Sequence, residues 1–172
     1  TSPVSGKVWG AAEPMDMIVL RAVSFRYDGN PVLVDIDLTI REGDFLAIIG
    51  PNGSGKTTLV KVILGLLPPT SGEVRLFGKS RAEFSDWGKI GYVPQKATHI
   101  DPVFPASVEE VVGMALMAGP RQGGASGRES RAKVLKALEE VGMSGSAGTP
   151  IGRLSGGQQQ RAFIARALVT SP

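Results

Sequence analysis

The stretch GPNGSGKTT at positions 50–58 constrains the fold more than any other part of the sequence. It fits the pattern G-x-x-x-x-G-K-[ST], between an apolar run at 45–49, typical of a strand buried on both faces, and a helix-like apolar run at 57–67. Glycines let the backbone turn tightly with its N–H groups pointing inward, and the following helix presents its positive end to the same place. Strand, loop and helix together predict a triphosphate site in an α/β protein.

The residue types of this loop indicate separate roles. Lys56 is expected to reach the β- and γ-phosphates as a mobile point charge, and the hydroxyl of Thr57 is expected to bind Mg²⁺. The other candidate nucleotide-binding residues of the loop are Gly50, Pro51, Asn52, Gly53, Ser54, Gly55 and Thr58. The placement of strand and helix disfavours an ordinary glycine-rich turn, but the loop alone leaves kinases, GTPases and motor-type ATPases open.

Strand patterns dominate the first half of the chain. Besides 45–49, strands are predicted at 18–27, 32–40, 73–78 and 90–93. Apolar and polar residues alternate between 32 and 40. This alternation predicts one half-buried face made of Val32, Val34, Ile36, Leu38 and Ile40.

Helix patterns dominate the second half. Helices are predicted at 107–118, 128–141 and 156–169, separated by loops at 119–127 and 142–153. The first of these helices is expected to begin in a capping box, because Ser107 is followed three residues later by Glu110.

A second glycine motif, LSGGQ at 154–158, precedes the last predicted helix. Ser155 is a good N-cap, and Gly156 and Gly157 leave a row of N–H donors unobstructed at the positive end of the helix. This arrangement predicts a second anion site. Taken alone, it is equally compatible with a capped helix whose glycines allow close packing.

Composition excludes several classes of protein. The chain has 172 residues, which suits one compact domain, and a net charge of +3 from scattered basic residues, which gives no argument for nucleic acid. The absence of cysteine excludes disulfides and thiolate metal sites. No apolar run approaches the roughly 20 residues that cross a bilayer, and residues 1–14 lack the apolar stretch of a signal peptide. His99 and Asp101 stand in a loop without further ligands, which makes a poor metal site.

Together with Gln95 in YVPQK, the two glycine motifs resemble the nucleotide-binding subunit of an ABC transporter, over residues 18–172. The resemblance implies an α/β fold: a P-loop NTPase (RecA-like) core with an antiparallel β subdomain and a helical signature subdomain. The expected parts are a disordered leader at 1–16, the nucleotide-binding core at 17–97, the helical subdomain at 98–155 and the signature helix at 156–172. The region 90–116 is similar to the ATPases of zinc and manganese importers.

The resemblance also implies roles, with ATP and Mg²⁺ as cofactors. Two copies would pair head to tail, with Ser155, Gly156, Gly157 and Gln158 facing the γ-phosphate held by the partner. Tyr27 matches the aromatic residue that stacks on adenine, although a strand-end core aromatic is the alternative. Gln95 would touch Mg²⁺ or the attacking water, and it joins Lys56 as a catalytic candidate. Membrane-spanning permease subunits, and indirectly a substrate-binding protein, are the implied partners at the cytoplasmic face of the membrane.

The sequence departs from the family after Pro172, where members continue with an apolar strand ending in Asp-Glu and, further on, a histidine. We therefore expect the 172 residues to be a portion of a longer subunit, with the C-terminal part missing and little activity alone. The alternatives are a soluble ABC-type ATPase without a membrane partner, a P-loop kinase or GTPase, and, for the literal portion, a non-catalytic ATP-binding piece. The kinase and GTPase alternatives offer no role for LSGGQ.

Overall fold

The computed structural model describes residues 14–95, 100–101, 103–117 and 127–172. The chain divides into two compact units, Thr1–Phe84 and Ser85–Pro172, which are called the first and the second unit below. Most of the predicted leader, the loop at 119–126 and His99 lie outside the described residues.

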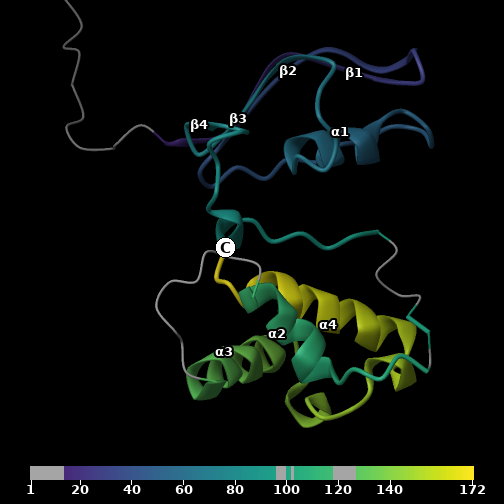
Figure 1. The fold of residues 1–172 in the computed structure, drawn as a ribbon, viewed down its shortest axis with the longest axis vertical. Coiled ribbons are helices and arrows are strands. Elements are labelled where there is room, and N and C mark those ends of the chain that lie inside the picture. The colour runs from purple at the N-terminus through teal and green to yellow at the C-terminus, as the bar shows by residue number, and fades with distance from the viewer. Residues whose placement is uncertain (1–13, 96–99, 102, 118–126) are drawn as a thin grey trace, which may run out of the picture. The chain divides into compact units, whose positions relative to one another are not determined.

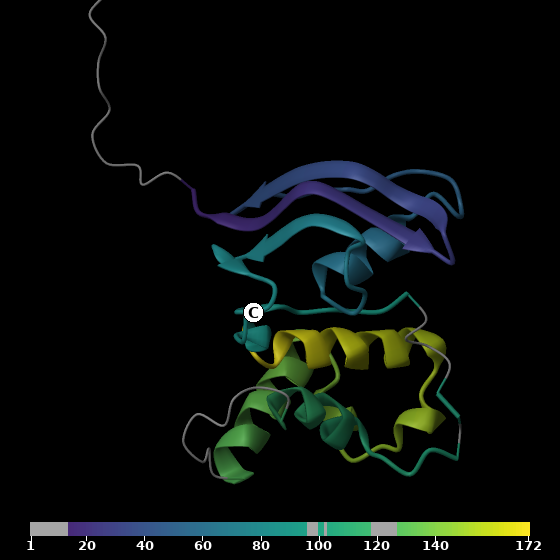
Figure 2. The same ribbon diagram turned by 45° about the horizontal axis from the view of Figure 1, so that its top comes forward.

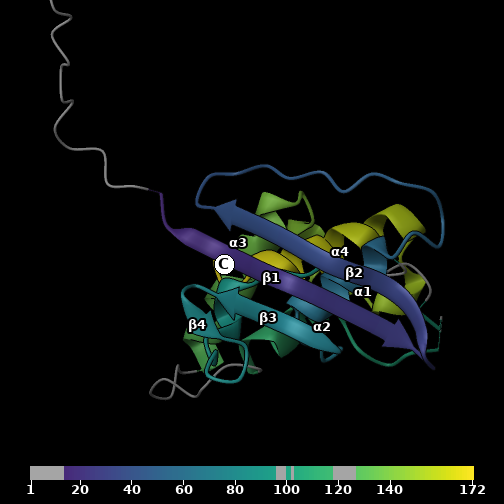
Figure 3. The ribbon, with the colours of Figure 1, turned by 90° about the horizontal axis from the view of Figure 1, so that it is seen from above.

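The first unit is built on a four-stranded antiparallel sheet in the order β2-β1-β3-β4. Its strands are β1 (Asp16–Tyr27), β2 (Asn30–Arg41), β3 (Ser71–Leu76) and the short β4 (Lys79–Ser80). Figure 3 shows the long β1–β2 hairpin and β3 lying side by side. The predicted strands at 18–27, 32–40 and 73–78 are therefore confirmed, with small shifts of their ends.

The predicted alternation along β2 is wrong at Val34, which is 61% exposed, while its neighbour Leu33 is 5% exposed. The cause is a bulge: Asp35 has a φ of +47°, and the pairing with β1 shifts register near it. An extra residue in one strand moves the following side chains to the opposite face. Ile36, Leu38 and Ile40 resume the half-buried face beyond the bulge, as predicted.

Helix α1 (Lys56–Ile63) is shorter than the predicted 57–67 and buries one face rather than its whole surface. It ends in a Schellman motif: the N–H of Leu66 donates to the carbonyl of Lys61 (2.9 Å), and the N–H of Gly65 donates to the carbonyl of Val62 (3.0 Å). Gly65 has a φ of +66°, and the guanidinium of Arg81 donates to its carbonyl (3.1 Å). Glycine in the left-handed region thus ends the helix before the prolines do.

The predicted strands at 45–49 and 90–93 are absent from the structure. Residues 45–49 run without regular structure, and Phe45 and Ile49 are 97% and 92% exposed. A strand exists only when a neighbour accepts and donates its backbone hydrogen bonds. Within the described part of the chain, no strand pairs with either segment.

The second unit contains three helices, α2 (Val108–Met117), α3 (Gly127–Glu140) and α4 (Gly156–Leu168), which confirms the helix predictions to within two residues. Three short 3₁₀ turns accompany them: η1 (Trp87–Lys89), η2 (Ser144–Ser146) and η3 (Ile151–Arg153). Figures 1 and 2 show the three helices gathered together. Their shared core contains Val108, Val112, Val134, Leu138, Ile151, Ala162, Ala165 and Val169.

The predicted capping box of α2 is confirmed. The N–H and the hydroxyl of Ser107 both donate to Oε2 of Glu110 at 2.7 Å, and the N–H of Glu110 donates to Ser107 Oγ at 3.3 Å. The pKa of Glu110 is lowered below its ordinary value because both bonds from Ser107 favour the charged carboxylate. The bond from the hydroxyl has the larger effect, and the bond from the backbone N–H has the smaller one.

Candidate nucleotide-binding site

The nucleotide loop, residues 50–58, needs glycine at position 55 for two reasons. Gly55 has a φ of +88°, and a Cβ there would lie 3.0 Å from the carbonyl oxygen of Val32 and 3.2 Å from Cδ2 of Leu33. A side chain would therefore meet both backbone strain and a clash with β2. Gly55 also caps α1, and its carbonyl accepts the first helical hydrogen bond, from the N–H of Leu59 (2.8 Å).

The loop closes over the ammonium group of Lys56. Its Nζ donates to the carbonyls of Gly50 (2.8 Å) and Pro51 (2.6 Å), with Ser54 Oγ at 3.4 Å. The first turn of α1 contains no acidic residue. A lysine charge and a positive helix end therefore act at the same place without a carboxylate to neutralise them, which favours an anion there.

The two threonines after Lys56 have different surroundings. Thr57 is exposed at the first turn of α1, whereas Thr58 is buried within the first unit. Of these two threonines, it is therefore Thr57 whose hydroxyl a metal ion beside the loop can reach. The chemistry suits Mg²⁺, which prefers oxygen donors and is commonly bound by one or two protein ligands plus phosphates.

Tyr27 ends β1 and is 44% exposed. Its ring meets that of the buried Phe25 edge to face, with centroids 4.8 Å apart. Tyr27 pairs with Asn30 across the hairpin, and Val32, two residues further along β2, touches Gly55. The same hairpin thus carries the aromatic ring and contacts the loop, as a residue that stacks on a bound base requires.

The signature turn, residues 155–158, begins α4 with a capping box. The N–H of Gln158 donates to Ser155 Oγ (3.4 Å), and the N–H of Ser155 donates to Gln158 Oε1 (2.9 Å). Ser155 was predicted as the cap, but the returning bond to Gln158 was not. Gly156 and Gly157 are exposed, and no atom lies within 4 Å of the position that a Cβ would take on either.

Gln95 is exposed and lies in the second unit. Asp101 is engaged in its own turn, since its Oδ1 accepts the N–H of Val103 at 2.9 Å. Across the described ranges, no group of three or more His, Cys, Asp or Glu residues could hold a metal ion.

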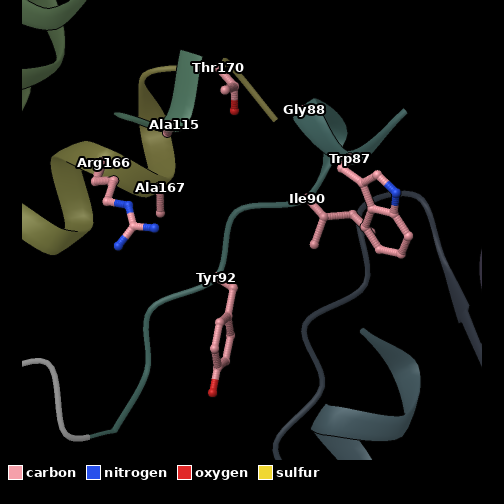
Figure 4. A pocket seen from close by; sticks show the side chains of 8 residues that line it. All are labelled: Trp87, Gly88, Ile90, Tyr92, Ala115, Arg166, Ala167 and Thr170. Carbon is pink, nitrogen blue, oxygen red and sulfur yellow. The ribbon is translucent and has the colours of Figure 1, made fainter. Parts of the chain in front are cut away.

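Two features of the second unit escaped the sequence analysis. One is the burial of Gln159 in α4, which the approximate helical period of the buried Ala162 and Ala165 could have indicated. The other is a pocket of about 200 Å³ between the segment with Trp87 and Tyr92 and the end of α4 with Arg166 and Thr170 (Figure 4). The residues that line it come from segments far apart in the sequence, so no local sequence pattern predicts this pocket.

The model of the family described as "ABC transporter" matches residues 33–172. The chain is 43% identical over 156 residues to the zinc uptake system ATP-binding protein ZurA of Listeria innocua, covering 91% of this chain and 61% of that protein. It is 46% identical over 147 residues to the zinc transport system ATP-binding protein TroB of Treponema pallidum, covering 86% and 54%. For the manganese transport system ATP-binding protein MntB of Bacillus subtilis, the identity is 45% over 154 residues, with 88% and 59% covered.

Solved structures agree with these relatives. The dimeric structure of MJ0796, a bacterial ABC transporter cassette, superposes with a TM-score of 0.78 at 35% identity, covering 91% of this chain and 71% of that one. A post-hydrolysis state of the same cassette, bound to ADP and Pi, gives a TM-score of 0.77.

The chain spans little more than half the length of the curated relatives above. In the part of the chain that the structure describes, no helix is long and apolar enough to cross a membrane.

Proposed function

Because this chain belongs to the ABC transporter family, we propose that it is the ATP-binding and ATP-hydrolysing subunit of a transporter that imports metal ions of the zinc and manganese type. The named functions of ZurA, TroB and MntB support the choice of metal ions. The observation that carries the proposal is the nucleotide loop, in which the Lys56 ammonium and the positive end of α1 converge without a neutralising carboxylate.

ATP and its Mg²⁺ would bind through backbone and side-chain groups of this chain. The loop N–H groups and Lys56 would hold the β- and γ-phosphates, and Tyr27 would stack on adenine. Thr57 and Gln95 would offer neutral oxygen atoms to Mg²⁺. The metal, when bound, supplies positive charge that offsets the charge developing on the transferred phosphoryl group.

The glycines of the signature turn support a second copy of the chain as the partner. Gly156 and Gly157 have ordinary helical φ values and open space around them, so nothing in the described ranges requires glycine there. Glycine in a helix costs up to about 1 kcal/mol relative to alanine. A ligand that approaches the backbone closely would explain both glycines. We assign that ligand as the γ-phosphate on the partner's nucleotide loop, to which residues 155–158 would donate.

Hydrolysis would then depend on charge held at the shared site. Lys56 and the N–H groups of the signature turn would stabilise the phosphoryl oxygens from opposite sides. The Gln95 amide would orient the attacking water. Closure of the two copies would move membrane-spanning permease subunits as a rigid body at the cytoplasmic face, with a substrate-binding protein as an indirect partner.

The substitution Ser155→Arg in the whole protein tests the shared site. The long cation would fill the space that the partner's nucleotide needs, so ATP-driven dimerisation and hydrolysis should fall at least about 100-fold, the scale of losing oxyanion donors. The affinity of the monomer for ATP should stay within about twofold, because the nucleotide loop is untouched. Gln160→Arg adds the same charge at an exposed position of α4 and serves as the control.

Sedimentation with a slowly hydrolysed ATP analogue measures the dimer, and phosphate release measures hydrolysis. Undiminished hydrolysis in the Ser155→Arg protein would contradict the shared site. The cargo has its own test: cells that lack the gene should accumulate less zinc or manganese, measured by mass spectrometry of the washed cells. Unchanged content of both metals would contradict the proposed cargo.

A further inference from the structure

Gln159 combines deep burial with incomplete hydrogen bonding. It is 4% exposed, and among the described residues only Thr58 is also a buried polar side chain. Its Nε2 donates to the carbonyl oxygen of Ile151 at 3.3 Å. Its Oε1 is buried and accepts no hydrogen bond. A buried acceptor without a donor opposes folding, so stability alone does not account for glutamine at this position.

The bond from Gln159 to Ile151 closes a ring around the signature turn. Residues 155–157 are exposed, whereas Ile151 on one side and Gln159 on the other are buried. The carbonyl of Ile151 also accepts the N–H of Leu154 (3.2 Å), and the carbonyl of Ser155 accepts the N–H of Gln159 (2.8 Å). The two ends of an exposed glycine turn are therefore joined to each other at its base.

The ring is anchored in the core of the second unit. Ile151 belongs to that core, and its N–H donates to the carbonyl of Ala106 (2.9 Å), just before α2. The side chain of Gln159 thus connects the signature turn to a fixed point rather than to another exposed loop.

We propose that Gln159 is a positioning residue for the signature turn. Its side chain fixes η3 against the first turn of α4, so that the N–H groups of Gly156 and Gly157 keep the direction needed to meet an anion on a second copy of the chain. Glycines have the greatest backbone freedom of all residues, and a turn that contains two of them gains most from a tether at its base. This inference rests on the shared nucleotide site proposed above.

The substitution Gln159→Met separates positioning from stability. Methionine has a similar shape but no amide, so it removes both the tether and the unpaired oxygen. The carbonyl of Ile151 keeps the N–H of Leu154, so no new buried group loses its only partner. Gln160→Met, the same change at the exposed neighbour, is the matched control.

The test uses the whole protein. For Gln159→Met, the Tm without nucleotide should stay within about 3 °C, and the monomer's affinity for ATP should stay within about twofold. Dimerisation with a slowly hydrolysed ATP analogue should weaken about tenfold, the scale of one hydrogen bond. Amide hydrogen exchange at Gly156 and Gly157 should become faster in the monomer. Gln160→Met should change none of these.

Each other outcome overturns the inference in a distinguishable way. If the unmodified protein shows no ATP-driven dimer, the shared site fails and the inference fails with it. If the unmodified protein dimerises and Gln159→Met dimerises equally well, only the role of Gln159 is wrong. If Gln159→Met lowers the Tm by more than about 5 °C, the side chain serves stability and not positioning.

Discussion

The nucleotide loop (residues 50–58) and the signature turn (residues 155–158) both place glycines at the start of a helix, yet they use glycine differently. In the nucleotide loop, Gly55 has a left-handed backbone and presses against Val32. In the signature turn, Gly156 and Gly157 are helical, and a Cβ on either would meet no described atom within 4 Å. The first loop is shaped by contacts within its own unit. The second turn carries glycines for which the described residues show no packing requirement.

The two regions also differ in what closes them. In the nucleotide loop, the Lys56 ammonium donates to the backbone carbonyls of Gly50 and Pro51. A capping box of neutral side chains holds the signature turn, and Gln159 tethers its base. We infer that the nucleotide loop is able to adjust to its ligand, whereas the signature turn is already held in its binding conformation. The four predictions below test this difference, from the largest expected effect to the smallest.

Replacing glycine by alanine should affect the free energy of unfolding very differently in the nucleotide loop and in the signature turn. Gly55→Ala adds a Cβ at a positive φ and close to Val32, so it should lower the free energy of unfolding of the first unit by about 2–4 kcal/mol and abolish ATP binding. Gly156→Ala meets no atom and should leave stability unchanged or raise it by up to about 1 kcal/mol. Urea unfolding measures both. Equal losses would break the comparison.

Removal of the lysine should affect binding more than folding. Lys56→Ala deletes the charge at the loop, so the affinity for ATP should fall about 10- to 100-fold, as expected for hydrogen bonds from a charged donor. Circular dichroism should show that the fold persists. Lys61→Ala, which removes a lysine from the last turn of the same helix, is the control. An unchanged ATP titration of Lys56→Ala would refute the assignment of the loop.

Substitutions of Ser155 can separate its role as the cap of α4 from its proposed role in binding an anion. Ser155→Ala removes the capping oxygen and should destabilise the second unit by about 1 kcal/mol in urea unfolding. Ser155→Asp keeps a capping oxygen and adds a negative charge at a positive helix end, so its stability should equal or exceed that of the unmodified protein. The same aspartate should repel a phosphate and suppress the ATP-driven dimer. A normal dimer in the aspartate variant would show that no anion approaches this turn.

Acid should distinguish the two capping boxes of the second unit. The folded-state pKa of Glu110 is lowered, so its contribution to stability is present above the unfolded pKa and is lost as the pH falls through the folded pKa. Gln158 does not titrate, so the cap of α4 should survive. Hydrogen exchange at the N–H of Ser107 and of Ser155 measures the two caps separately. Simultaneous loss of both would indicate global unfolding instead, and Glu110→Gln should remove the pH dependence.

Structural features that depend on only a few neighbouring residues were predictable from the sequence. The helices of the second unit follow from periodicity, and their caps follow from Ser107, Glu110 and Ser155. The nucleotide loop follows from its glycines and Lys56, because positive φ angles and backbone donors are local requirements.

Features that depend on distant partners were not predictable. The strands expected at 45–49 and 90–93 have the right composition, but a strand needs a neighbour, and composition does not reveal which one is present. The bulge at Asp35 reverses the exposure of Val34 through pairing with β1, which the alternation of one strand cannot indicate. Gln159 and its exposed neighbour Gln160 are the same residue type, so composition does not separate them, and the helical period of Ala162 and Ala165 is the one local indication that Gln159 is the buried member of the pair.

The bulge in the β1–β2 hairpin has a consequence for how the protein behaves at high concentration. β2 is the outermost strand of its sheet, the position at which another chain could add itself. Asp35 exchanges hydrogen bonds with Ser24, and Asp37 accepts the N–H of Ala22, where the pairing of β1 with β2 shifts register. Bulges in edge strands hinder pairing with a further strand, so we expect this edge to be a poor template for self-association.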